Sequence, residues 1–300
     1  MVPGATRAWY PVTVAIPRHS SRQIDVIRTD ISDMFEKSTL VVAHPDDEAL
    51  WFSSIVKRVG EIVICFQDIA SRPVWTEGRR RCKEIYPLGN ATFLGLQESE
   101  VFNGSNWMAP VPTHYGLEVS KRKDSFPGFS VQRYQKNYVE LRLQLWTRLQ
   151  FCRNVFTHNP WGEYGHEEHV QVFRTIQDLQ PELGFNLWFS NYCSNKSNNL
   201  MFQYISGIES KYLKLKTNLG LAKSLMHLYQ RNNCWTWFEN YTWFPQECFM
   251  SFKREGVKKR KMCDIFPLNF IRLDFCPDIE NTWNLNGNAQ KLISRLWNLA

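Results

Sequence analysis

Three short segments made almost entirely of apolar residues recur between residues 40 and 94, and stretches with helical spacing separate them. The segments are Leu40–Ala43, Glu61–Phe66 and Ala91–Leu94, and the helical stretches are 47–59 and 76–88. A glycine follows each helical stretch, where it is well placed to end a helix. Continuous apolar strands that alternate with helices are typical of a parallel sheet buried on both faces. We therefore predict an α/β fold that is Rossmann-like and three-layered, with a mostly parallel sheet and helices on both faces.

The remainder of the chain continues this alternation after a long irregular region. Residues 97–131 are rich in Pro, Gly and Ser and lack periodicity, and a segment of this length in a compact domain is usually functional. After it we predict helices around 134–149 and 172–179 and over 211–230, and strands at 154–157, 185–190 and 270–275. Residues 1–35 are predicted to form an N-terminal extension with an edge strand at 8–16, and residues 36–300 the main domain. That domain ends in a Trp-rich part from about residue 232.

A dense polar cluster follows the first predicted strand directly. His44, Asp46, Asp47 and Glu48 lie within five positions, immediately after a segment that should be buried. Burying so many ionisable groups is costly unless another charge compensates them. A bound cation would provide that compensation, so this cluster predicts a metal site.

A second polar cluster, His158–His169, follows the strand predicted at 154–157. Because ligands of open parallel sheets bind beyond the carboxyl ends of the strands, both clusters can face one crevice. His44 and Asp47 are three positions apart, as are His166 and His169. Two imidazoles and one carboxylate, with a position left for water, form the usual catalytic zinc site. Asp46 would remain beside the metal, where it can act as a base towards water.

Each cluster also has a purely structural interpretation. Asp46 or Asp47 could cap a helix, and His166 and His169 could form a surface pair. The occurrence of both clusters at strand ends favours the metal site over these interpretations.

Composition and charge restrict the class of protein further. No apolar run approaches the roughly 18 residues that a membrane span needs, and the first residues lack a secretory pattern, so we expect a cytoplasmic protein. The eight cysteines are scattered without a Cys-x-x-Cys motif and are expected to be reduced. The net charge of +7 weakly favours anionic partners, but no nucleic-acid-binding motif is present, so we expect no nucleic-acid partner.

The motif His-Pro-Asp-Asp-Glu at His44–Glu48 resembles the signature of the LmbE-like, or PIG-L, zinc-dependent N-deacetylases. The second cluster looks like the Gly-His-Pro-Asp-His element of that family, and the resemblance extends in register from about Leu40 to His169. Members remove acyl groups from amino sugars, including N-acetylglucosaminyl phosphatidylinositol. These motifs are specific for the family and unspecific for the substrate.

The resemblance implies a role for each matching residue. His44, Asp47 and His169 would bind Zn²⁺, or another divalent metal such as Fe²⁺, and Asp46 would be the general base. His166 and Tyr164 would stabilise the oxyanion. Arg79 and Glu98 would bind sugar hydroxyls, although a surface ion pair is an equally good interpretation of these two. Where the family usually has Pro and Asp, this chain has Glu167 and Glu168, a departure that bears on the tuning of His166.

The predicted activity is the removal of an N-acyl group, usually acetyl, from a small-molecule or glycoconjugate amino sugar. Three other interpretations use the same residues. A set of two histidines and one carboxylate also suits a non-haem Fe(II) oxygenase. The chain could hydrolyse a non-sugar amide or a thiol conjugate, or it could bind carbohydrate without turnover. We expect specificity to lie in residues 97–131 and in the Trp-rich part.

Overall fold

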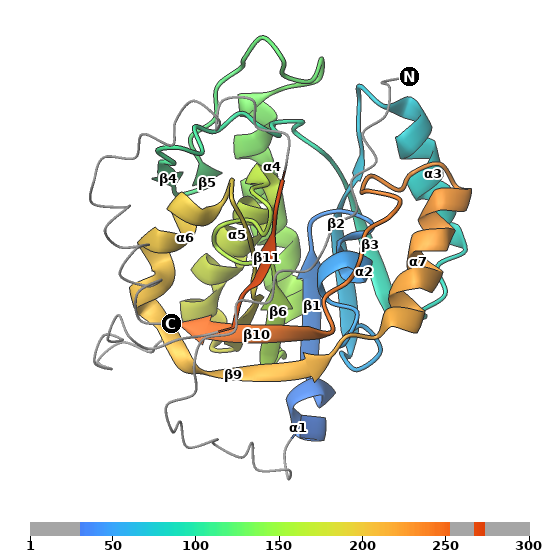
Figure 1. Ribbon diagram of the computed structural model, residues 1–300, viewed down its shortest axis with the longest axis vertical. Helices are drawn as coiled ribbons and strands as arrows, with labels where there is room; N and C mark the ends of the chain where they lie inside the picture. The colour runs from blue at the N-terminus through green and yellow to red at the C-terminus, as the bar shows by residue number, and fades with distance from the viewer. Residues whose placement is uncertain (1–30, 253–266, 274–300) are drawn as a thin grey trace.

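A seven-stranded sheet forms the centre of the protein in the computed structural model, which describes residues 31–252 and 267–273 (Figure 1). Its strands are β1 (Ser38–Val42), β2 (Glu61–Asp68), β3 (Ala91–Gln97), β6 (Asn154–Thr157), β7 (Asn186–Ser190), β9 (Ile208–Lys216) and β10 (Gln246–Phe252), in the order β3-β2-β1-β6-β7-β10-β9. From β3 to β7 all neighbours are parallel, and β10 is antiparallel to both of its neighbours. The prediction of a mostly parallel sheet is confirmed.

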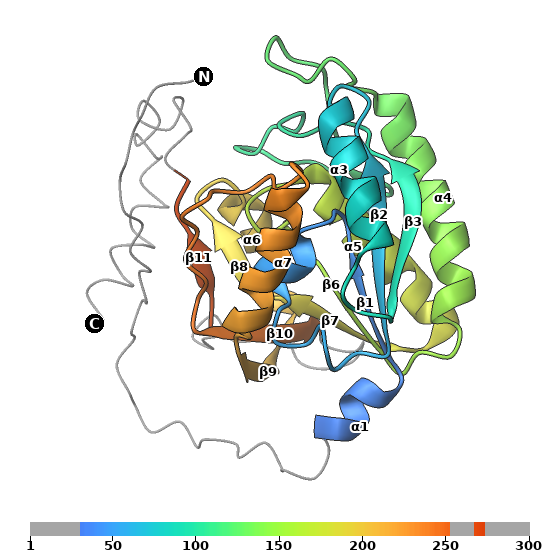
Figure 2. The ribbon, with the colours of Figure 1, turned by 90° about the vertical axis from the view of Figure 1, so that its right-hand side faces the viewer.

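Helices cover both faces of this sheet, as Figure 2 shows for α3 and α4. The helices are α1 (Ile31–Glu36), α2 (Asp47–Trp51), α3 (Pro73–Glu84), α4 (Val131–Leu149), α5 (Glu167–Leu183), α6 (Asn198–Tyr204) and α7 (Leu219–Arg231). Successive side chains of β1 point to opposite faces of the sheet, and a hydrophobic core lies on each face. Val41 packs in one core with α4 and α5, whereas Leu40 packs in the other with α2, α3 and α7. Strands buried on both faces explain the continuous apolar segments in the sequence.

The first predicted helix is much shorter than its spacing indicates, because α2 ends at Trp51 instead of continuing to residue 59. Ser54 interrupts it, since its backbone N–H donates to the Glu247 carboxylate at 2.9 Å. The hydroxyls of Ser53 and Ser54 donate to the same carboxylate, both at 2.6 Å. Separate turns follow, and they still bury Ile55 and Val56.

Two other boundaries also differ from the prediction. The helix predicted over 211–230 begins only at residue 219, because the residues before it belong to β9. In that strand, buried Leu213 and Leu215 alternate with exposed Lys214 and Lys216. This period of two is typical of a strand with one buried face. The helix predicted over 76–88 is α3, Pro73–Glu84.

Small sheets lie beside the main one. They are β4 (Pro112–Thr113) with β5 (Gly116–Leu117), and β8 (Tyr192–Ser194) with β11 (Asn269–Ile271). β11 overlaps the strand predicted at 270–275 at residues 270 and 271, and residues 274 and 275 of that prediction lie outside the described residues. The edge strand predicted at 8–16 lies outside the described residues. Among residues 31–252 and 267–273, no helix is both long and apolar enough to cross a membrane.

The strands that precede the two polar clusters are direct neighbours. β1 pairs with β6 in parallel, with Val41 opposite Thr157. Both strands therefore end at the same edge of the sheet, and the side chains that follow them meet there.

Candidate active site

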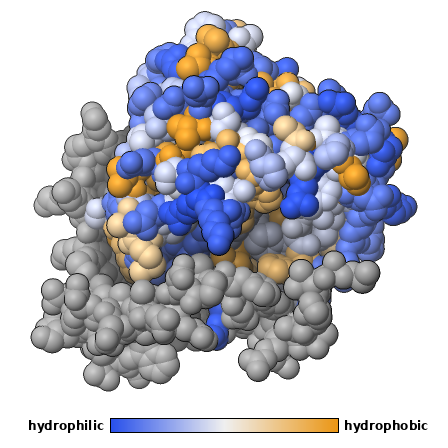
Figure 3. All heavy atoms as spheres, turned by 90° about the horizontal axis from the view of Figure 1, so that it is seen from above, coloured by the Kyte–Doolittle hydropathy of each residue, from blue (hydrophilic) through white to orange (hydrophobic). Residues whose placement is uncertain are grey.

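The residues singled out in the sequence gather around one cavity of about 720 Å³ at the carboxyl ends of β1 and β6. Its walls include His44, Asp46, Asp47, Arg79, Glu98, Tyr164 and His166, and His169 is fully buried beside them. Side chains from 97–131 and from the Trp-rich part complete the wall, among them Phe102, Trp107, Thr236 and Trp237. Figure 3 looks onto this side of the molecule, where hydrophilic and hydrophobic side chains are mixed.

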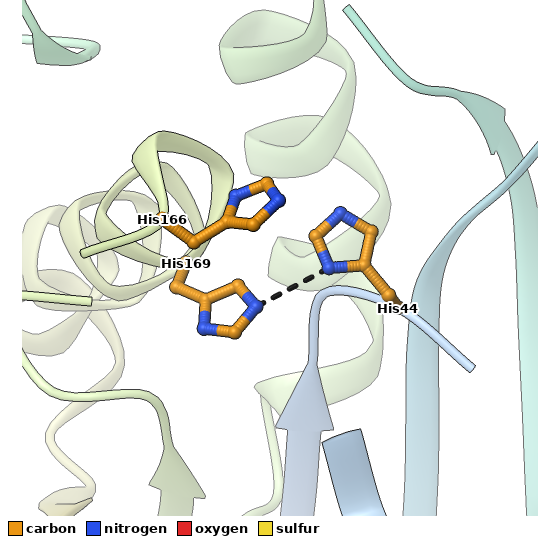
Figure 4. Close-up of side chains that lie close together, drawn as sticks. All are labelled: His44, His166 and His169. Atoms are coloured by element: carbon orange, nitrogen blue, oxygen red, sulfur yellow. Dashed lines mark hydrogen bonds between the residues drawn. The ribbon is translucent and has the colours of Figure 1, made fainter. Parts of the chain in front are cut away.

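Two ring nitrogens, one from His44 and one from His169, lie close to each other and to the Asp47 carboxylate. Nδ1 of His44 lies 3.2 Å from Nε2 of His169 (Figure 4) and 3.4 Å from a carboxylate oxygen of Asp47. The other carboxylate oxygen of Asp47 lies 3.3 Å from Nε2 of His169. Ligands of a tetrahedral ion with bonds of about 2.0–2.1 Å are separated by about 3.3–3.5 Å. The donor set and its spacing therefore fit a divalent metal ion.

A carboxylate lies on the far side of each of the two imidazoles, His44 and His169. It determines which ring nitrogen faces the place where a metal ion would bind. Glu163 Oε2 lies 2.8 Å from Nδ1 of His169, and Glu168 Oε2 lies 2.9 Å from Nε2 of His44. A carboxylate behind each histidine holds the ring in the tautomer that a metal ligand needs. Burial raises the pKa of Glu163, but His158 and His169 together lower it to about 2. Sequence reasoning missed Glu163 and treated Glu168 only as a departure from the family.

His158 is a third imidazole next to this group, and its position directly after β6 parallels that of His44 after β1. Its Nε2 accepts the Ala43 N–H at 2.8 Å, and its Nδ1 lies 2.9 Å from Glu163. Its ring stacks on His169 with centroids 3.9 Å apart. A backbone N–H already occupies the lone pair of His158 Nε2, so His158 supports the group and is a poorer ligand than His44.

Asp46 adopts a backbone conformation that non-glycine residues rarely adopt, with φ at 109°. Its N–H donates to Glu48 at 3.1 Å, and its Oδ2 accepts the Thr236 hydroxyl at 2.5 Å. Burial and the Asp47 carboxylate raise the pKa of Asp46 to about 8, whereas Arg79 and Thr236 act in the opposite direction. A cation held by Asp47 would also favour the ionised form.

His166 lies above His169 with its ring nearly parallel, at 13° and 4.7 Å between centroids (Figure 4). Its Nδ1 accepts the Glu168 N–H at 3.2 Å at the start of α5. Burial, His44 and His169 lower the pKa of His166, so the imidazole is neutral with its proton on Nε2. Tyr164 packs edge-on against His166, and its phenol lines the same cavity.

Arg79 and Glu98 form an ion pair inside the cavity wall. The exposed fractions of the two residues are 2% and 9%, so the interpretation of a surface ion pair is wrong. Nε of Arg79 has no hydrogen-bond partner within the described part of the protein. This buried, incompletely paired arrangement suits a polar ligand.

Glu167 attaches the long segment 97–131 to the start of α5. Its carboxylate accepts the backbone N–H of Ser105 and the indole N–H of Trp107, both at 2.9 Å, and the N–H of Asn103 at 3.2 Å. The neighbouring Glu168 accepts the Ser99 N–H and hydroxyl, both at 2.6 Å. The two glutamates that depart from the family pattern therefore hold this segment against the site.

Comparison with known proteins identifies distant relatives, and no family model matches the chain. An uncharacterized protein of Acanthamoeba polyphaga mimivirus is 26% identical over 193 residues, which cover 64% of this chain and 69% of that protein. The N-acetylglucosaminyl-phosphatidylinositol de-N-acetylase of Bos taurus is 24% identical over 151 residues, 49% of this chain and 51% of that protein. The chain thus matches about half the length of the second relative.

Two solved structures that align with the chain come from teicoplanin deacetylases. A deacetylase–teicoplanin complex is 12% identical with a TM-score of 0.44, and its alignment covers 73% of this chain and 99% of that chain. The zinc-inhibited form of a teicoplanin deacetylase is 11% identical with a TM-score of 0.45 and the same coverage. The sequence match to the bovine protein is the finding that bears on the predicted family.

Proposed function

We propose that this protein, whose resemblance to the LmbE-like or PIG-L family is confirmed by its match to a de-N-acetylase, is a metal-dependent N-deacetylase of an amino sugar. The proposal rests on one observation: three side chains that can bind a metal lie together at one cavity, and a separate carboxylate, Asp46, lines the same cavity. Three protein ligands leave a coordination position open for water, and a nearby carboxylate that binds no metal can take a proton from that water, so the arrangement suits hydrolysis.

The proposed metal ligands are His44, Asp47 and His169. A divalent cation, Zn²⁺ in our proposal, would polarise the amide carbonyl and lower the pKa of the attacking water. Glu168 and Glu163 keep the two imidazoles oriented through the hydrogen bonds on their far nitrogens.

Asp46 is proposed to take the proton of the attacking water. It lines the cavity together with Asp47, and it is not among the proposed metal ligands. His166 and Tyr164 would donate hydrogen bonds to the oxyanion that forms when water adds to the amide. Nε2–H of His166 can then pass its proton to the departing amine.

Arg79 and Glu98 are proposed to bind hydroxyls of the sugar. The buried guanidinium supplies donors and the carboxylate supplies acceptors, which together suit hydroxyl groups. The aromatic residues in the wall, such as Phe102, Trp107 and Trp237, offer apolar surface to the faces of the ring and to the group attached to it.

Amine release tests the proposal. Purified protein is incubated with a panel of N-acetylglucosamine conjugates and with simple non-sugar N-acetyl amides, and free amine and metal content are measured on the same sample. We expect amine release from at least one sugar conjugate and a divalent metal bound to the chain. Release from non-sugar amides alone would reassign the substrate, and oxygen consumption with a keto acid would favour an Fe(II) oxygenase.

A further inference from the structure

The carboxylate of the proposed base is held from outside its own motif, by Thr236 in the segment that follows α7. The Thr236 hydroxyl donates to Oδ2 of Asp46 at 2.5 Å, and the Thr236 backbone N–H lies 3.3 Å from the same oxygen. In the described part of the chain no hydrogen bond reaches Oδ1 of Asp46. The contact therefore distinguishes the two oxygens, and leaves Oδ1 to receive a proton.

The Thr236 segment is fixed against the motif by aromatic side chains. The indole N–H of Trp243 donates to the Ala49 carbonyl in α2 at 2.8 Å. The Trp237 ring packs on Trp51 and Tyr164, with centroids 5.3 and 4.6 Å apart. A hydroxyl carried on so firmly attached a segment can hold a carboxylate in one rotamer.

Two neighbouring charges act on the Asp46 carboxylate. The negative charge of Asp47 and the positive charge of Arg79 both influence its ionisation. Without the hydrogen bond from Thr236, repulsion by Asp47 and attraction by Arg79 would be free to turn the carboxylate. A displacement of about 1 Å at a reacting group can reduce turnover by about 100-fold.

From this geometry we infer that Thr236 is a positioning residue that orients the Asp46 carboxylate for proton transfer. The inference rests on the proposed function, because it assigns Thr236 a role through the base of that reaction. Thr236 is itself exposed at the cavity wall, so its side chain can be exchanged without disturbing the core.

The test compares Thr236→Val, which keeps the shape and removes the hydroxyl, with Thr236→Ser, which restores it. Thr242→Val is the matched control, because Thr242 is an exposed threonine of the same segment that does not line the cavity. We expect Thr236→Val to lower kcat about 10- to 100-fold with KM within about twofold, and Thr236→Ser and Thr242→Val to stay near wild type. In the Asp46→Asn background, Thr236→Val should have no further effect.

Several results would overturn the inference. One is an unchanged kcat in Thr236→Val, and another is a loss of kcat in Thr236→Ser as large as in Thr236→Val. A third is a rise in KM alone in Thr236→Val, which would make Thr236 a substrate contact. Crystal structures of the two variants provide a readout that needs no activity: the Asp46 carboxylate should turn in Thr236→Val and stay in Thr236→Ser. If the wild type releases no amine, the proposed function fails, and an unmoved carboxylate in Thr236→Val separately rejects the positioning role.

Discussion

Nδ1 of His44 lies 3.2 Å from Nε2 of His169, although 125 positions separate the two residues in sequence. The contact exists because β1 and β6 are parallel neighbours, so that the residues after both strands meet at one edge of the sheet. Neither cluster forms the site alone, since each supplies one of the two histidines.

Replacing Asp46 with Asn should abolish turnover and leave the metal bound. The amide has nearly the same shape but accepts a proton far less readily, and loss of a general base typically costs about 10²- to 10⁴-fold in rate. Steady-state amine release and metal content, measured together, check this. Wild-type turnover in the variant would remove Asp46 from its proposed role.

Replacing Glu163 with Gln should weaken metal binding about 10- to 100-fold, because a carboxylate that orients a metal-binding imidazole contributes about this much. Glu163 accepts from Nδ1 of His169, and it also contacts His158. Competition with a chelating dye measures the affinity. Glu182→Gln, at an exposed position on α5, is the control and should bind metal like the wild type.

The same variant gives a prediction for pH, made on metal-free protein. The folded pKa of Glu163, about 2, lies below its ordinary value of 4.5. Its ionised form therefore stabilises the fold fully above pH 4.5, and this contribution is lost as pH falls from 4.5 to about 2. Urea unfolding should show wild type more stable than Glu163→Gln at pH 7, with a gap that narrows as pH falls below 4.5. A gap that widens on acidification contradicts the assignment.

Replacing Glu167 with Gln should loosen residues 97–131. The amide keeps one acceptor oxygen but turns an NH₂ group towards a backbone N–H, which costs about 1–3 kcal/mol in a buried position. Limited proteolysis should then cut this segment faster, and KM for sugar conjugates should rise more than kcat falls. Glu118→Gln, exposed in the same segment, should change neither.

The sheet and the principal side chains of the site could be predicted from the sequence, because their signals are local. A continuous apolar strand followed by a polar cluster appears twice, and parallel strands end at one edge. His44, Asp47 and His169 therefore lie together as expected, and His166 lies above them.

The supporting residues could not be predicted, because their partners are distant in sequence. Nothing in the sequence near Thr236 indicates a contact with Asp46, which lies 190 positions away. The shortened α2 depends on Glu247 in β10, which is equally remote. His158 is an exception, since its place after β6 repeats that of His44 after β1 and offered a usable signal.

Metal stoichiometry across four proteins tests whether Asp47 and His169 bind the ion, because His166 and His158 also lie close enough to compete for it. Wild type, Asp47→Asn, His169→Ala and His166→Gln are purified identically, dialysed against one divalent metal and analysed by atomic emission. We expect metal in the wild type and in His166→Gln, and little in Asp47→Asn and His169→Ala. An empty site in His166→Gln, or full occupancy in Asp47→Asn, would contradict this assignment.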